Sequence, residues 1–178
     1  MSRKVLVAYA SKMGSTAEIA AAIGAELRAA GHDVTVRDAA EIRSITSYDA
    51  VVLGSAIYAR RWRPDAVRFL RRHVEELRER HVWLFHSGPV GPDKDEAQTM
   101  PPKVARLAEK IGTSPATTFA GRLEPATAKG WLARRLARGD MAADSRDWDK
   151  IAAWADEIAI AMSATEIADQ HPDDEEAY

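Results

Sequence analysis

The residues with the clearest chemical potential stand together near the start of the chain, in the segment Ser11-Lys12-Met13-Gly14-Ser15-Thr16. Three of them carry hydroxyl groups, which can donate hydrogen bonds to phosphate oxygens. Gly14 allows the backbone to turn tightly and to approach a ligand closely. The segment follows a short apolar run and opens a helical pattern, and a helix start offers unpartnered N–H groups and the positive end of the helix dipole. The segment therefore predicts a phosphate-binding site.

The same residues have a purely structural interpretation. Ser15-Thr16-Ala17-Glu18 has the Ser-x-x-Glu form of a capping box, in which the Ser and Glu side chains satisfy N–H groups at a helix start. A helix uses such a cap whether or not it binds a ligand. Both interpretations stay open at this point.

Other phosphate-site motifs are missing from the sequence. The chain has no G-x-x-x-x-G-K-S/T segment, which argues against a P-loop ATPase, and no G-x-G-x-x-G after the first apolar run, so the dinucleotide fingerprint is missing. A response-regulator receiver would need an Asp at the end of the third apolar run, where this chain has Gly54 and Ser55. The absence of cysteine excludes disulfides, thiolate catalysis and cysteine-based metal sites.

Size and charge narrow the class of protein further. The chain has 178 residues, of which 46% are hydrophobic and 29% charged, which suits one globular domain with a buried core. The net charge of −2 argues against a nucleic-acid binder. No stretch approaches the roughly 20 apolar residues of a membrane-spanning helix, and no small-residue cleavage site follows the first apolar run. We therefore expect a cytoplasmic protein.

Short apolar runs alternate with helical patterns along the chain. The runs that predict strands are Lys4–Ala10, Asp33–Arg37, Ala50–Ala56, Val82–Ser87 and Thr117–Ala120. The helical patterns lie between the phosphate segment and Gly31, at Ala39–Ser47, at Val67–Leu77, at Val104–Ile111 and at Trp148–Met162. This alternation predicts an α/β fold with a parallel sheet, helices on both of its faces and right-handed crossovers.

The segment Ser11–Thr16 resembles the T/S-x-T-G-x-T pattern that follows the first strand in the flavodoxin family, except that Met13 replaces the usual Thr. Tyr48–Ser55 resembles the third strand of that family. Ala56–Ala59 resembles the loop that lines the isoalloxazine ring, and Ser87–Gly91 resembles the second loop that faces the ring.

The resemblance implies a flavodoxin-like three-layer sandwich, with a five-stranded parallel sheet in the order 2-1-3-4-5 and flavin mononucleotide (FMN) at its C-terminal edge. The first segment would anchor the phosphate, Tyr58 would pack against the ring, and backbone amides of the two loops would bond its polar edge. FAD and a deazaflavin stay open as occupants of the same cleft. The implied cofactor-binding residues are Ser11, Lys12, Met13, Gly14, Ser15, Thr16, Ser55, Ile57, Tyr58, Ala59, Ser87, Gly88, Pro89 and Val90.

Within that family, the chain is most similar to the menaquinone-dependent protoporphyrinogen IX dehydrogenase group. The similar segments are Gly54–Tyr58, Phe119–Leu123 and Asp147–Ile151, and that group also has an insertion, in longer form, where this chain has residues 122–146. The resemblance implies an FMN-dependent oxidoreductase that passes electrons between a protoporphyrinogen- or quinone-like substrate and an acceptor. A flavodoxin-type electron carrier that docks to partner proteins ranks second. Carriers tend to be strongly acidic around the flavin, whereas this chain is nearly neutral and its expected flavin rim is rich in arginine. A flavin-free interaction module is the third interpretation, and Met13 is its support.

Two basic clusters predict contact with an anionic partner. Arg134, Arg135 and Arg138 lie in the insertion, where a basic amphipathic element would meet a membrane surface, a quinone pool or an acidic substrate. The alternative for that cluster is a surface helix with its arginines in water. Arg60-Arg61-Trp62-Arg63 directly follows the expected ring loop. We would then expect the protein in the cytoplasm, free or peripheral to the inner face of the membrane, as a monomer or homodimer.

Two further segments have structural interpretations. His86, at the end of the fourth apolar run, is expected to be a buried or rim histidine with ordinary hydrogen bonds. Residues 166–178 carry six acidic side chains and no Lys or Arg, so we expect a disordered tail after a domain that spans residues 1–165.

Overall fold

The computed structural model describes residues 2–88, 97–123 and 143–170. Five parallel strands form its central sheet in the order β2-β1-β3-β5-β6. With the short β4 set aside, this is the predicted five-stranded sheet in the predicted order, so the expected fold class is confirmed. The strands are β1 (Lys4–Ala10), β2 (Asp33–Asp38), β3 (Ala50–Tyr58), β5 (His81–Ser87) and β6 (Thr117–Phe119).

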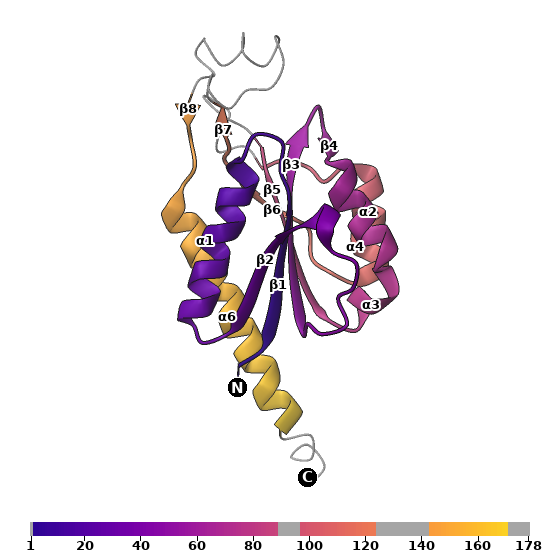
Figure 1. Cartoon of the computed structure of the whole chain (residues 1–178), viewed down its shortest axis with the longest axis vertical. Coiled ribbons are helices and arrows are strands. Elements are labelled where there is room, and N and C mark those ends of the chain that lie inside the picture. Colours follow the sequence, from indigo (N-terminus) through magenta and orange to yellow (C-terminus); the bar gives the residue numbers. More distant parts are fainter. Residues whose placement is uncertain (1, 89–96, 124–142, 171–178) are drawn as a thin grey trace, which may run out of the picture.

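Helices cover both faces of this sheet (Figure 1). One face carries α1 (Ser15–Ala29) and α6 (Trp148–Gln170), which pack against each other. The other face carries α2 (Pro64–Arg72), α3 (Val74–Arg78) and α4 (Pro102–Ile111). The three layers explain why the strands read as continuous apolar runs, because side chains on both faces of the sheet are buried.

Strand β1 shows how one run serves two cores. Val5 and Val7 belong to the core under α1 and α6, whereas Leu6 and Ala8 belong to the core under α2, α3 and α4. All four side chains are fully buried. Successive side chains of a strand point to opposite faces, so one apolar heptapeptide stabilises both outer layers.

An aromatic cluster fills the core beneath α6. Phe85, Phe119 and Trp154 meet edge to face, with ring centroids 5.4–5.9 Å apart. Gly54, on the neighbouring strand, leaves room for the Phe85 ring, because a Cβ there would lie 2.0 Å from it. Gly54 is therefore a packing position.

Two predicted helices differ from the structure. The pattern at Ala39–Ser47 forms only a 3-10 turn, η1 (Ala39–Glu41), followed by irregular chain. Ser44 hydrogen-bonds Thr46 two residues on, and such local side-chain bonds compete with a helix. The stripe that begins after Pro64 is divided at His73 into α2 and α3.

Helix α6 runs to Gln170, five residues past the domain end predicted at residue 165. The sequence has neither Gly nor Pro between Trp148 and Gln170, so nothing interrupts the helix there. That part of the predicted tail is helical, and residues 171–178 lie outside the described residues.

Three short strands were not predicted. β4 (Arg61–Trp62) pairs antiparallel with the end of β3, and β7 (Arg122–Leu123) pairs with β8 (Ala143–Asp144) in a separate ribbon at the two ends of the insertion. No helix in the described ranges is both long enough and apolar enough to span a membrane.

Candidate functional site

The predicted phosphate segment forms a tight turn between β1 and α1, at the carboxyl edge of the sheet. Gly14 has a φ of 92°, a conformation that residues with a Cβ rarely adopt, and it occupies the N-cap position of α1. Its N–H donates to the Ser11 hydroxyl at 3.0 Å, and its carbonyl accepts the Glu18 N–H at 3.0 Å. The turn presents the start of α1 at the sheet edge.

The capping box predicted at Ser15–Glu18 does not form. Gly14 takes the cap position without any side-chain hydrogen bond, and Ser15 is already the first helical residue. The Ser15 hydroxyl instead accepts the N–H of Arg122 at 3.2 Å, and the Glu18 carboxylate pairs with two arginines. Within the described chain, then, no side chain caps the first N–H groups of α1, the groups that bind anions at helix starts.

A buried pair of hydroxyls joins this turn to the end of β5. Thr16 Oγ1 and Ser87 Oγ lie 2.7 Å apart, and both residues are buried. The pair has two protons, and the bond between them uses one. The second proton can be donated to a further acceptor, so the pair still offers one donor.

An ionic cluster lies beside the same turn. Arg122 Nη2 is 2.7 Å from Glu18 Oε1, and Arg146 donates both to Glu18 and, at 2.5 Å, to Asp144. These hydrogen bonds from Arg146 lower the pKa of the Glu18 and Asp144 carboxyl groups. Glu18 Oε1 and Arg122 Nη2 lie 3.8 Å and 4.0 Å, respectively, from where a Cβ of Gly14 would be. The sequence placed Arg122 in the insertion, and the structure brings the Arg122–Glu18 ion pair to the predicted phosphate turn.

The segment Ala56–Ala59, predicted as a loop, is mostly strand. β3 continues to Tyr58 and folds back into β4, with Ile57 opposite Trp62. The two turn residues, Ala59 and Arg60, have φ of 47° and 59°, the positive values that a type I′ hairpin turn requires. The segment predicted to line the flavin ring is therefore part of a β-hairpin that projects from the sheet.

Tyr58 brings this hairpin into contact with the phosphate turn. Its side chain is 40% exposed, the Lys12 ammonium lies 4.5 Å from its ring centroid, and its hydroxyl donates to Met13 Sδ at 3.9 Å. Partial burial raises the pKa of the Tyr58 hydroxyl. Met13, which replaces the usual Thr of the pattern, thus contacts Tyr58, the residue expected to pack against the flavin ring.

Ser55 lies inside the protein. It is fully buried, its hydroxyl donates to the Ala56 carbonyl at 3.0 Å, and it accepts the Arg63 N–H at 2.9 Å. The side chain therefore holds the base of the hairpin. We assign it no direct contact with a cofactor, contrary to the prediction from sequence.

The predicted second ring loop begins at Gly88. Its N–H donates to the Phe119 carbonyl at 3.0 Å, so this amide is not directed at a flavin ring as predicted. A Cβ on Gly88 would lie 2.7 Å from the half-buried Ile57 and 3.3 Å from Gln98, so glycine permits these segments to meet. Pro89 and Val90, also predicted, lie outside the described residues, as do Arg134, Arg135 and Arg138.

His86 is a buried hub that the sequence located only in part. It is 0% exposed, its Nδ1 accepts the Trp62 indole N–H at 3.2 Å, and its Nε2 lies 2.8 Å from Thr118 Oγ1. Because an indole N–H only donates, the neutral imidazole carries its proton on Nε2 and donates it to Thr118. Burial lowers the pKa of His86 to about 4, so the ring is neutral near pH 7. The expectation of a buried histidine with ordinary hydrogen bonds is confirmed, but no sequence signal identified its partners.

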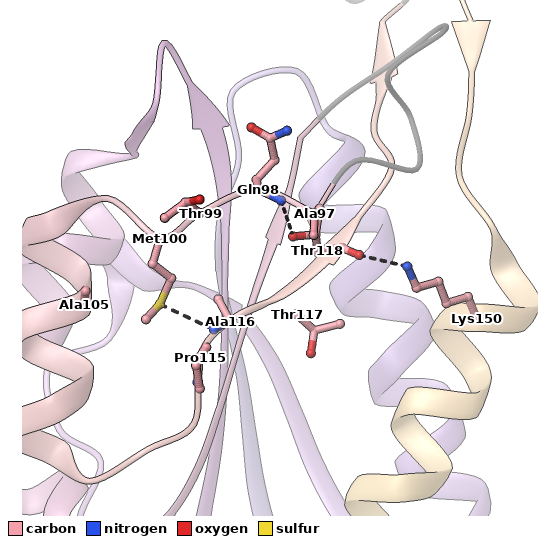
Figure 2. Close-up of a pocket in the computed structure, with 10 residues that line it drawn as sticks. All are labelled: Ala97, Gln98, Thr99, Met100, Ala105, Pro115, Ala116, Thr117, Thr118 and Lys150. Carbon is pink, nitrogen blue, oxygen red and sulfur yellow. Dashed lines mark hydrogen bonds between the residues drawn. The ribbon is translucent and has the colours of Figure 1, made fainter.

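A pocket of about 570 Å³ opens at the edge of the sheet beside β6 (Figure 2). Thr118 and Gln98 line it and bond each other, since the Gln98 N–H donates to Thr118 Oγ1 at 3.0 Å. Lys150 Nζ donates to the Thr118 carbonyl at 3.3 Å, and Met100 Sδ accepts the Ala116 N–H at 3.4 Å. The pocket therefore shares a wall with the hydrogen bonds around His86.

Comparison with known proteins agrees with this geometry. In solved structures, rubredoxin oxygen:oxidoreductase from Desulfovibrio gigas superposes with a TM-score of 0.62 at 18% identity, over 90% of this chain but only 36% of that protein. Flavodoxin 2 from Bacillus cereus gives 0.60 at 20% identity, and the flavodoxin of Streptococcus pneumoniae TIGR4 gives 0.57 at 17%. These matches cover 90% and 89% of this chain and 99% of each flavodoxin.

At these identities the structural likeness shows the fold alone, and no curated protein matches the sequence. The family model described as "Flavodoxin domain" matches residues 6–136, which is more than half of the chain. The matched range contains the phosphate turn, the Tyr58 hairpin and the His86 hub. The chain belongs to the flavodoxin domain family.

Proposed function

We propose that this protein binds FMN at the carboxyl edge of its sheet and transfers electrons through it. The observation that carries the proposal is that α1 begins after Gly14 without a side-chain cap, and that the exposed Tyr58 contacts Met13 of the same turn. A helix start of this kind binds phosphate through its N–H groups and its dipole. An exposed tyrosine ring offers a flat surface for a flavin.

The residues present fit such a cofactor. The N–H groups of Ser15 and Thr16, with the donor retained by the Thr16–Ser87 pair, would hold the phosphate. Tyr58 would cover the ring, and Arg122, whose guanidinium is paired with Glu18, would lie beside the phosphate turn. Bound FMN supplies one- and two-electron transfer, while the protein positions and shields the group.

The proposal is tested by purifying the protein without added cofactor, recording its visible spectrum and identifying any released chromophore by mass. We expect a yellow protein that releases FMN in near-stoichiometric amount, or a colourless protein that takes up FMN more tightly than riboflavin. Riboflavin is the matched control, because it lacks only the phosphate. A protein that binds neither compound would refute the proposal.

For the electron partner, we propose a small substrate of the quinone or protoporphyrinogen type. Support comes from Arg60 and Arg61, which are exposed at the tip of the hairpin next to Tyr58. Charge reversal at both positions is expected to lower kcat/KM for an acidic porphyrinogen about tenfold and to affect a neutral quinone less. Arg78→Glu on α3, also an exposed arginine, serves as the control. Equal rates for all three proteins would refute an anionic substrate at this hairpin.

A flavodoxin-type electron carrier is the second candidate. The observation that favours it is that the chain matches 99% of the length of two flavodoxins. A carrier would transfer electrons to a protein acceptor much faster than to a small quinone, with a rate that falls as salt screens the docking charges. Faster turnover with the quinone would favour the oxidoreductase.

A further inference from the structure

The hydrogen bonds of His86 connect two separate parts of the site. Trp62 belongs to β4, on the return arm of the hairpin that carries Tyr58. Thr118 belongs to β6, and its hydroxyl also accepts the N–H of Gln98 from the segment before α4. One imidazole therefore stands between the hairpin and the segment 97–100.

Each of these bonds has a fixed direction. The Trp62 indole donates to Nδ1, Nε2 donates to Thr118 Oγ1, and that oxygen accepts again from Gln98. The hydroxyl of Thr118 remains a donor for one further bond. Because the imidazole is fully buried, a rearrangement that broke either bond would leave a polar atom without a partner, which is costly in an apolar interior.

The connection reaches the ring-facing residues through short contacts. Trp62 lies opposite Ile57 across the hairpin, and Tyr58 is the next residue of that strand. On the other side, Gln98 lies against Gly88, which in turn lies against Ile57. A shift of the imidazole would therefore displace the hairpin and the segment around Gln98 relative to each other.

We propose that His86 is a positioning residue that sets the distance between the Tyr58 hairpin and the segment 97–100, and so shapes the space for the flavin ring. This inference rests on the proposed binding of FMN. It assigns His86 no contact with the cofactor and no proton transfer. A residue that only filled the core could be replaced by an apolar side chain without changing the site.

The test compares three variants that remove the bonds one at a time or together: Trp62→Phe, Thr118→Val and His86→Leu. His81→Leu is the matched control, because His81 lies on the same strand at its opposite end, stacked on Trp83. For each protein the dissociation constants of FMN and riboflavin, the visible circular dichroism of the bound flavin and the hydrogen exchange of the flavin-free protein are measured.

We expect His86→Leu to weaken the binding of FMN and of riboflavin by the same factor, about tenfold. The substitution would disturb the part of the site that holds the flavin ring, which both compounds share, and leave the phosphate turn unchanged. Its flavin circular dichroism should change, and exchange should accelerate both in the hairpin and at residues 97–100. Each single-bond variant should show part of these effects and His81→Leu none. If His86→Leu does not fold, the two single-bond variants decide the question.

The possible failures are distinguishable. In one outcome the wild type binds FMN, and the variants show the same flavin affinities, circular dichroism and hydrogen exchange as the wild type. This outcome would overturn the role of His86 and leave the proposed function intact. A wild-type protein that binds neither flavin would overturn the proposed function and the role in shaping a flavin site. A loss confined to FMN, with riboflavin unchanged, would place the effect at the phosphate and also overturn the inference.

Discussion

Lowering the pH should destabilise this protein through the single side chain of His86. In the folded state burial between Trp62 and Thr118 lowers the pKa of the imidazole from 6.5 to about 4, whereas in the unfolded chain it titrates near its ordinary value. Between these two values the unfolded chain binds the proton and the folded protein does not. The stabilisation is therefore complete above about pH 6.5 and is lost progressively as the pH falls toward 4.

The magnitude follows from the interval between the two pKa values. At about 1.4 kcal/mol per pH unit, the interval corresponds to about 3 kcal/mol over the whole window and about 2 kcal/mol between pH 6.5 and pH 5. A domain of this size is stable by only about 5–15 kcal/mol. The protonation of one buried ring is thus expected to remove a substantial fraction of the total.

Urea unfolding followed by far-UV circular dichroism between pH 7.5 and pH 5 measures this effect when the wild type is compared with His86→Leu. Other titrating groups are the same in both proteins, and Glu18 and Asp144, whose pKa values are lowered, lose their contribution at still lower pH. The wild type should lose about 2 kcal/mol more than the variant over this range. Parallel pH profiles would refute the reasoning, because they would mean that the buried ring accepts a proton without cost.

Four substitutions to or from glycine test the backbone geometry and the packing. Gly14→Ala should lower the free energy of unfolding, measured in urea, by about 1–2 kcal/mol, because the φ of Gly14 is 92°. It should also weaken FMN binding in a fluorescence titration. Arg60→Gly should raise the free energy of unfolding by about 1 kcal/mol by relieving a φ of 59°, whereas Arg61→Gly, in the adjacent strand, should lower it. Gly54→Ala should lower the free energy of unfolding by about 1–3 kcal/mol, and with it the melting temperature, because its Cβ would overlap the Phe85 ring; unchanged values would contradict the packing argument.

The sheet could be predicted from sequence because its evidence is local. A run such as Lys4–Ala10 is apolar at every position that the helices cover, and its period and length needed no knowledge of distant residues. The same local evidence failed at Ala39–Ser47, where apolar residues recur but hydroxyl side chains favour a turn. Ile42 and Ile45 are buried there without a helix.

The candidate site was predictable only where it consists of neighbours in sequence. Ser11–Thr16 could be recognised as a turn before a helix, but the partners that decide its chemistry are distant. Glu18 is drawn away from the capping box by Arg122 and Arg146, more than 100 residues along the chain. His86 likewise depends on Thr118, 32 residues away, which no periodicity indicates.

The edge of the sheet at β6 has a consequence for how copies of this protein behave in solution. An unpaired edge strand offers its free N–H and C=O groups to any other extended chain, which is a route to aggregation. Here the Lys150 ammonium bonds the Thr118 carbonyl and the Met100 sulfur accepts the Ala116 N–H, so two of the groups that a second strand would need are already paired. A strand arriving from another copy would also have to displace a charge from the edge. The two side chains thereby hinder the addition of a strand from another molecule at this edge.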